Sequence, residues 1–161
     1  MASREIPDTE LMHAVQQGDT GAFEQLIDRY LPAFYRIAYR MSFNQADAED
    51  MVQDTCLKLW QRADSWDPSR SVNVKAWCMQ IMAHRCIDHT RRDRYVALHR
   101  EDGIVAEQVG SEDHIYQEER RKQMEYWLLA LPEKQRTALV LCHFEDMKQA
   151  EAAAAMGISI K

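Results

Sequence analysis

The 161-residue sequence is poor in residues that interrupt regular structure, with only five glycines and four prolines. It also lacks the long alternations of β-branched and polar residues that indicate strands. Alanine, leucine, methionine, glutamine, glutamate and arginine dominate instead, and these residues favour helices. Because 46% of the residues are apolar, the chain can form a helical core. The predicted fold class is all-α.

Other absences exclude whole classes of protein. No apolar run approaches the length of a membrane span, and the first 17 residues contain no signal-peptide core. We therefore expect no membrane insertion and a cytoplasmic location. The four cysteines, at positions 56, 78, 86 and 142, form no CxxC pair. Reduced and largely buried thiols are the expectation.

The sequence also lacks the signatures of catalysis. It contains no glycine-rich phosphate loop, no nucleophile elbow and no paired catalytic carboxylates. His84 and His89 lie near Cys78 and Cys86 in sequence, but on a helix His84 points away from the two cysteines. These side chains do not converge on one ion, so no metal site is predicted. We expect no enzyme, no catalytic residue and no cofactor.

Charge is segregated along the chain although the net charge is only -6. Residues 84–100 hold five arginines against Asp88 and Asp93, whereas residues 101–119 hold seven acidic residues and neither lysine nor arginine. Such segregation indicates separate anionic and cationic partners rather than uniform coating of nucleic acid.

Apolar periodicity and capping residues predict helices over residues 8–17, 20–41, 45–62, 76–95, 115–130, 132–145 and 147–156. Asp8 and Asn44 are the expected N-caps of the first and third helices, and Pro32 predicts a kink or break in the second. Three units follow: a first domain over 1–95, an acidic linker over 96–114, and a second domain over 115–161.

The helix over 76–95 organises the first domain because it carries two different surfaces. One is an apolar stripe at helical spacing, formed by Met79, Met82, Ala83, Cys86, Ile87 and Thr90. The other combines aromatic and charged residues, namely Trp77, Ile81, His84, Asp88, Arg91, Arg92 and Tyr95. Cations together with aromatic planes suit single-stranded nucleic acid. Periodicity alone leaves a second interpretation open, in which the 63–75 loop covers Trp77 and Ile81 and the arginines are simply solvated.

A second candidate surface lies on the helix over 45–62. Asp47, Asp50 and Asp54 follow one another at spacings of three and four, with Glu49 and Gln53 beside them. Such a stripe is commonly a solvated helix face whose first residues also favour the helix dipole. The functional alternative is a protein-binding face for a basic helix.

The end of the chain has the form of an incomplete helix-turn-helix. Small alanines in EAAAAMGIS precede a glycine turn, and Ser159 could cap a following helix. The sequence ends two residues later, before the recognition helix that would enter the major groove. We therefore expect a fragment or a natural truncation that does not read a duplex through this unit.

Five stretches in this order resemble the extracytoplasmic-function (ECF) sigma factors, the small two-domain class of bacterial sigma factor. They are AFEQLIDRYLPAFYRIAYRM (22–41), ADAEDMVQDTCLKLW (46–60), KAWCMQIMAHRCIDHTRRDR (75–94), LPEKQRTALVLCHFE (131–145) and AEAAAAMGIS (150–159). The resemblance covers most of the chain outside the linker and the N-terminus. It implies sigma region 2 followed by a partial region 4, which would lack the helix that reads the minus-thirty-five element.

The resemblance also implies roles for particular residues. The contacts to the core polymerase would come from Asp47, Glu49, Asp50, Gln53 and Asp54. Contacts to the non-template strand of the minus-ten region would come from Trp66, Asn73, Lys75, Trp77 and His84. Phosphates and upstream duplex would be met by Arg85, Arg91, Arg92 and Arg94, with Asp88 on the same face. Extruding a base costs a few kcal/mol, which stacking would have to offset.

The implied partners are the RNA polymerase core, promoter DNA and an anti-sigma factor. The acidic linker would thread toward the active centre of the polymerase and the RNA exit path. Two other functions stay open at this point: a sigma-like interaction module or adaptor, and a helix-turn-helix regulator, both without DNA-melting activity.

Overall fold

The computed structural model describes residues 5–70, 73–98 and 112–160, and these ranges form helices joined by turns. The helices are α1 (Asp8–Gln16), α2 (Thr20–Ser42), α3 (Gln45–Gln61), α4 (Val74–Leu98), α5 (Glu112–Ala130), α6 (Glu133–Leu139) and α7 (Gln149–Met156). Two 3-10 turns lie between α3 and α4, and a π-helical turn, Val140–Phe144, follows α6. The predicted all-α class is confirmed.

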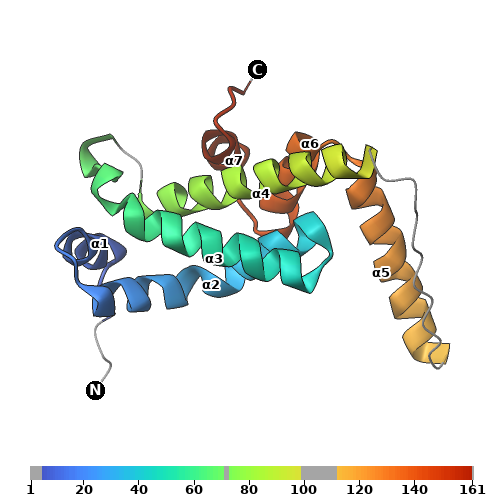
Figure 1. Cartoon of the computed structure of the whole chain (residues 1–161), viewed down its shortest axis with the longest axis horizontal. Coiled ribbons are helices and arrows are strands. Elements are labelled where there is room, and N and C mark those ends of the chain that lie inside the picture. Colours follow the sequence, from blue (N-terminus) through green and yellow to red (C-terminus); the bar gives the residue numbers. More distant parts are fainter. Residues whose placement is uncertain (1–4, 71–72, 99–111, 161) are drawn as a thin grey trace.

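The core lies between α2, α3 and α4, with α1 packed against α2 (Figure 1). Its largest fully buried side chains include Phe34, Ile37, Met51, Leu59 and Met82. Their apolar side chains recur at helical spacing, so each helix buries one stripe and leaves the rest of its surface to solvent.

Side-chain caps fix where the central helices begin. Asp19 accepts a hydrogen bond from the N–H of Ala22 at 3.0 Å, and Asn44 accepts one from Asp47 at 3.0 Å. The predicted Asn44 cap is thus confirmed. Asp8 is not a cap, because Pro7 occupies that position and the Asp8 carboxylate accepts from Arg29 of α2 at 2.6 Å.

Two other sequence predictions concern how helices continue. Of the kink or break predicted at Pro32, the break is absent because α2 continues through that residue, and the kink stays a prediction. The helix predicted over 132–145 is shorter, because regular α6 ends at Leu139 and a π-helical turn follows. The predicted linker falls largely on residues 99–111, outside the described residues, and the three domain boundaries stay predictions.

The second unit folds back onto the first. Helix α5 extends away from the core, whereas α6 and α7 return and pack against α4 (Figure 1). Helix α7 ends at Gly157, whose φ of 67° lies in the left-handed region that glycine favours. A long surface of α4 is therefore shared between the two units.

Candidate nucleic-acid interface

One side of α4 is buried, as its sequence predicts. The stripe of Met79, Met82, Ala83, Cys86, Ile87 and Thr90 is at most 7% exposed. The Thr90 hydroxyl donates to the carbonyl of Cys86 at 2.9 Å, which satisfies its polar group inside the core. Burial raises the pKa of the Cys86 thiol to about 12. This side fixes the rotation of α4 and so decides which residues face outward.

The other side of α4 is partly covered, and the two tryptophans expected to contact the non-template strand are both buried. Trp66 is 3% exposed and Trp77 is 9% exposed, and Ile81 is buried as well. The Trp66 ring meets the His13 ring of α1 edge-on at 5.6 Å. Since a base can stack only on an exposed ring face, neither tryptophan is placed to do so in this arrangement. Trp77 and Ile81 are thus buried, as the second of the two interpretations open from the sequence expected, and the role of Trp77 toward DNA stays a prediction.

Most of the other predicted DNA contacts are exposed. They are Asn73, Lys75, His84, Asp88, Arg91, Arg92 and Arg94. Asn73 also has a structural role, because its side-chain oxygen accepts the N–H of Ala76 at 2.7 Å at the start of α4. Lys75 borders a cavity of about 860 Å³ that Arg29 and Arg36 also line.

Acidic partners hold three of the four predicted phosphate-binding arginines. Arg85 is only partly exposed and donates to Asp54 of α3 at 2.7 Å. Glu133 of α6 lies 3.9 Å from Arg91 and 3.3 Å from Arg94. The second unit therefore occupies part of the basic face of α4.

His84 also faces the second unit. A Cβ added at Gly157 would lie 3.6 Å from the Nε2 atom of His84, so the turn after α7 is in contact distance of this ring. His84 is exposed, yet one side of its ring is next to the turn at Gly157 that follows α7.

The five predicted polymerase contacts on α3 separate into two groups. Asp47 and Asp54 turn toward α4, where Asp47 lies 3.7 Å from His89 and Asp54 binds Arg85. The others, Glu49, Asp50 and Gln53, are exposed. The acidic stripe therefore has one edge engaged within the domain and one edge open to a partner.

The open edge borders a groove between α2 and α3. This groove has a volume of about 630 Å³ and is lined by apolar Leu31, Pro32, Tyr35 and Val52 and by polar Asp28, Glu49 and Gln53. Leu31 and Tyr35 are 39% and 38% exposed. An apolar floor with an acidic rim suits an amphipathic basic helix. The sequence pattern showed the acidic residues but not the groove, because the apolar residues come from a different helix.

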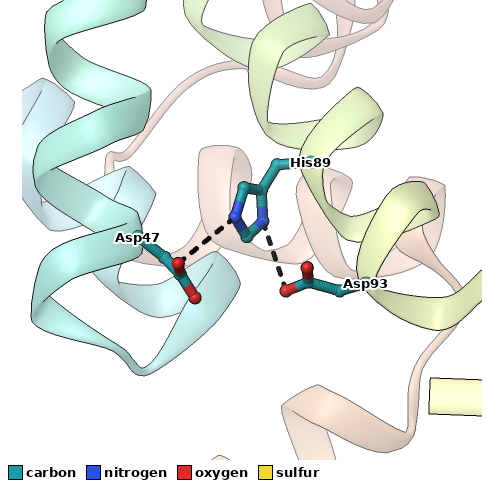
Figure 2. Close-up of side chains that lie close together, drawn as sticks. All are labelled: Asp47, His89 and Asp93. Atoms are coloured by element: carbon teal, nitrogen blue, oxygen red, sulfur yellow. Dashed lines mark ion pairs between the residues drawn. The ribbon is translucent and has the colours of Figure 1, made fainter. Parts of the chain in front are cut away.

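Two carboxylates and one imidazole meet where α3 begins. Figure 2 shows Asp47 beside one ring nitrogen of His89 and Asp93 beside the other. The sequence analysis considered His89 only with the cysteines and missed this group. A signal was present, since His89 and Asp93 are four residues apart and share a helix face, but Asp47 could be added only from the packing of α3 on α4.

Family models match both units of the chain. Sigma-70 region 2 matches residues 26–95, and Sigma-70, region 4 matches residues 121–161. The ECF RNA polymerase sigma factor SigW of Bacillus subtilis is 29% identical over 157 residues, covering 91% of this chain and 83% of that protein. The chain belongs to the ECF group of the sigma-70 family. It is an RNA polymerase sigma factor, a protein of promoter recognition and transcription initiation.

A further relative and two solved structures of sigma factors are similar to this chain over most of its length. The RNA polymerase sigma factor CnrH of Cupriavidus metallidurans is 28% identical, over 98% of this chain and 86% of that protein. The structure of CnrH in complex with the cytosolic domain of CnrY superposes with a TM-score of 0.68, at 26% identity, over 94% of this chain and 84% of that chain. The structure of the sigma factor RpoE in complex with the anti-sigma factor NepR, from Bartonella quintana, superposes with a TM-score of 0.61. It is 27% identical in sequence and covers 85% of this chain and 84% of that chain.

In this sigma factor the contacts between the two units involve residues that the sequence analysis did not select. Arg136 of α6 is 6% exposed and donates to the carbonyl of Met41, at the end of α2, at 2.7 Å. Glu145 accepts from Arg36 at 2.8 Å and lies 3.7 Å from Arg40. These pairs are more than 90 residues apart in sequence, so no local pattern reveals them.

Among the described residues, no helix is both long and apolar enough to cross a bilayer.

Proposed function

We propose that this sigma factor docks on core RNA polymerase through the groove between α2 and α3. The observation that carries this assignment is the pairing of an exposed apolar floor with an acidic rim. Leu31 and Tyr35 supply exposed apolar surface, and Glu49 and Gln53 line the same groove. Exposed apolar surface next to charge is typical of a protein-binding site. The binding element on polymerase would be a basic amphipathic helix.

Asp47 and Asp54 then have a different role from the one that the resemblance implied. Their carboxylates face α4, so they support the packing of α4 on α3 rather than contact polymerase. The polymerase-facing set becomes Glu49, Asp50 and Gln53, together with Leu31 and Tyr35. This reassignment makes the two groups separable by mutation.

For promoter DNA we propose the exposed basic side of α4. Arg91, Arg92 and Arg94 supply positive charge toward the end of α4, and His84 supplies a hydrogen-bonding group one side of which faces the same second unit. Asn73 and Lys75 lie at the start of α4, where Lys75 borders the cavity lined by Arg29 and Arg36 and would contact a separate part of the DNA. Because Glu133 holds Arg91 and Arg94, full use of this surface needs α6 and α7 to move off α4. Movement of this kind would also uncover His84. We therefore propose that the arrangement described here is a DNA-free form.

An anti-sigma protein is a further proposed partner, supported by the RpoE relative, whose structure contains the anti-sigma factor NepR. The proposed location is the cytoplasm, where the polymerase acts. No step of covalent chemistry is assigned to this chain.

A pull-down with core RNA polymerase tests the docking surface. The double variant Asp50→Arg, Gln53→Arg should bind at least tenfold more weakly, because it places positive charge against a basic helix. The double variant Gln61→Arg, Asp64→Arg makes the same two changes at exposed sites outside the groove and should bind as the wild type does. Equal binding by all three proteins would exclude the groove as the docking surface.

A further inference from the structure

We propose that Asp47, His89 and Asp93 form a site for one divalent transition-metal ion that links the start of α3 to the C-terminal half of α4. One ligand atom from each residue can be chosen so that all lie within 4.8 Å of one another. The three side chains come from two helices, and the two carboxylates lie beside different nitrogens of the His89 ring (Figure 2). Two of them, His89 and Asp93, are one helical turn apart, which is a common spacing for two ligands of one metal ion.

The distances in the structure are longer than those between ligands of one ion, and they involve both nitrogens of the ring. His89 Nε2 lies 3.7 Å from Asp47 Oδ1, and His89 Nδ1 lies 3.5 Å from Asp93 Oδ2. Ligand atoms that share one ion at bond lengths of about 2.0–2.2 Å are roughly 3 Å apart. Because the carboxylates flank different ring nitrogens, the ion would take one nitrogen, and one aspartate would rotate toward it.

Exposure allows this adjustment. The side chain of His89 is 13% exposed and is held between the helices, whereas those of Asp47 and Asp93 are 39% and 60% exposed. The imidazole is therefore the fixed ligand and the carboxylates are the adjustable ones. Open water on the carboxylate side would complete the coordination shell.

The donor set indicates the class of metal. One imidazole nitrogen with two carboxylate oxygens suits Mn²⁺, Fe²⁺, Co²⁺ or Zn²⁺, whereas Ca²⁺ and Mg²⁺ prefer oxygen ligands alone. Two carboxylates also match the double charge of the ion. Arg85 binds Asp54 and Arg94 lies next to Glu133, whereas Arg136, which interacts electrostatically with Asp93, donates its hydrogen bonds to backbone carbonyls.

The metal would act as a cross-link between the two central helices. Asp47 lies in the first turn of α3, and His89 and Asp93 lie on α4. An ion that binds the folded chain and not the unfolded one stabilises the fold by mass action. Its addition should therefore raise the melting temperature.

Titration of the untagged full chain with Mn²⁺, followed by the loss of the free-ion electron paramagnetic resonance signal, tests the site. Mn²⁺ is chosen because it binds thiols weakly, so the four cysteines do not compete. The wild type should bind one equivalent. His89→Gln and Asp93→Asn should each weaken this binding at least tenfold, and added Mn²⁺ should raise the melting temperature of the wild type but not of these two variants.

Matched controls are His143→Gln and Asp64→Asn, which make the same changes at exposed positions outside the cluster. Both should bind Mn²⁺ as the wild type does. Asp93→Asn alters an exposed side chain, so it should fold even if His89→Gln does not; circular dichroism checks this. The site is refuted if Asp93→Asn keeps the wild-type affinity. It is also refuted if the controls lose binding equally, or if a tenfold excess of Mg²⁺ displaces the ion.

Discussion

At the scale of single residues, Arg136 explains much of how the second unit is held. Its guanidinium donates to the carbonyls of Met41 at 2.7 Å, Leu129 at 2.9 Å and Leu131 at 3.2 Å. Met41 and Leu129 belong to the last turns of α2 and α5, where carbonyls lack partners within the helix. Burial lowers the pKa of Arg136 from its ordinary value, so the fold bears a desolvation cost that these acceptors offset.

We expect Arg136→Met to lower the free energy of unfolding by about 2–4 kcal/mol, because three carbonyls lose a charged donor while the apolar packing is partly kept. Arg136→Lys should have a free energy of unfolding between those of the wild type and Arg136→Met, since an ammonium cannot reproduce the planar fork of a guanidinium. Urea unfolding followed by circular dichroism measures both. Lys134→Met, at an exposed position of the same helix, is the control and should change stability by less than about 0.5 kcal/mol. A similar loss for Lys134→Met would contradict the capping role.

At the scale of elements, Trp77 tests whether the outer side of α4 is core or ligand surface. Trp77→Ala should lower the free energy of unfolding by about 3–5 kcal/mol, as expected when a large buried side chain is truncated. Trp127→Ala removes the same side chain from α5, where it is 62% exposed, and should cost less than about 1 kcal/mol. Urea unfolding of both variants checks this. If both variants lose less than about 1 kcal/mol of the free energy of unfolding, Trp77 is not a core residue and is again a candidate for stacking on DNA.

Helix boundaries near capping residues could be predicted well from the sequence. Asn44 begins α3 as expected, and the apolar stripe of α4 is buried as expected. Two failures are local, because Pro7 and not Asp8 precedes the first turn of α1, and a π-helical turn follows α6. The burial of Trp66 instead depends on a distant part of the chain, since the His13 ring of α1 lies against it. Periodicity shows that a helix has a second face and cannot show which other helix covers it.

In the candidate site, too, local properties could be predicted from the sequence and contacts between distant segments could not. The residue types at Glu49, Asp50 and the arginines of α4 were predictable, because charge and helical spacing are local properties. Their partners were not, since Asp54 meets Arg85 and Asp47 meets His89 only after α3 packs on α4. The roles of all these residues in binding polymerase and DNA stay predictions.

At the scale of the whole molecule, two glutamates tie the second unit to the first. Glu133 lies next to Arg91 and Arg94 of α4, and Glu145 binds Arg36 of α2. Glu145 is the more buried of the two, with 7% of its side chain exposed against 18% for Glu133. The arginines near Glu133 are themselves well exposed, so this contact is the one that solvent and salt weaken most easily. Opening of α6 away from α4 should begin there.

Glu133→Gln should therefore increase the affinity of the isolated sigma factor for a single-stranded oligonucleotide, because Arg91 and Arg94 become free to meet phosphates. Surface ion pairs contribute at most about 1 kcal/mol, so the gain should be no more than about fivefold. The dependence of affinity on salt should steepen, since more phosphates are neutralised. Fluorescence anisotropy at several salt concentrations measures both. Glu24→Gln makes the same charge change at an exposed position of α2 and should leave affinity and salt dependence nearly unchanged. If both variants gain equally, net charge explains the effect and Glu133 does not restrain the basic face.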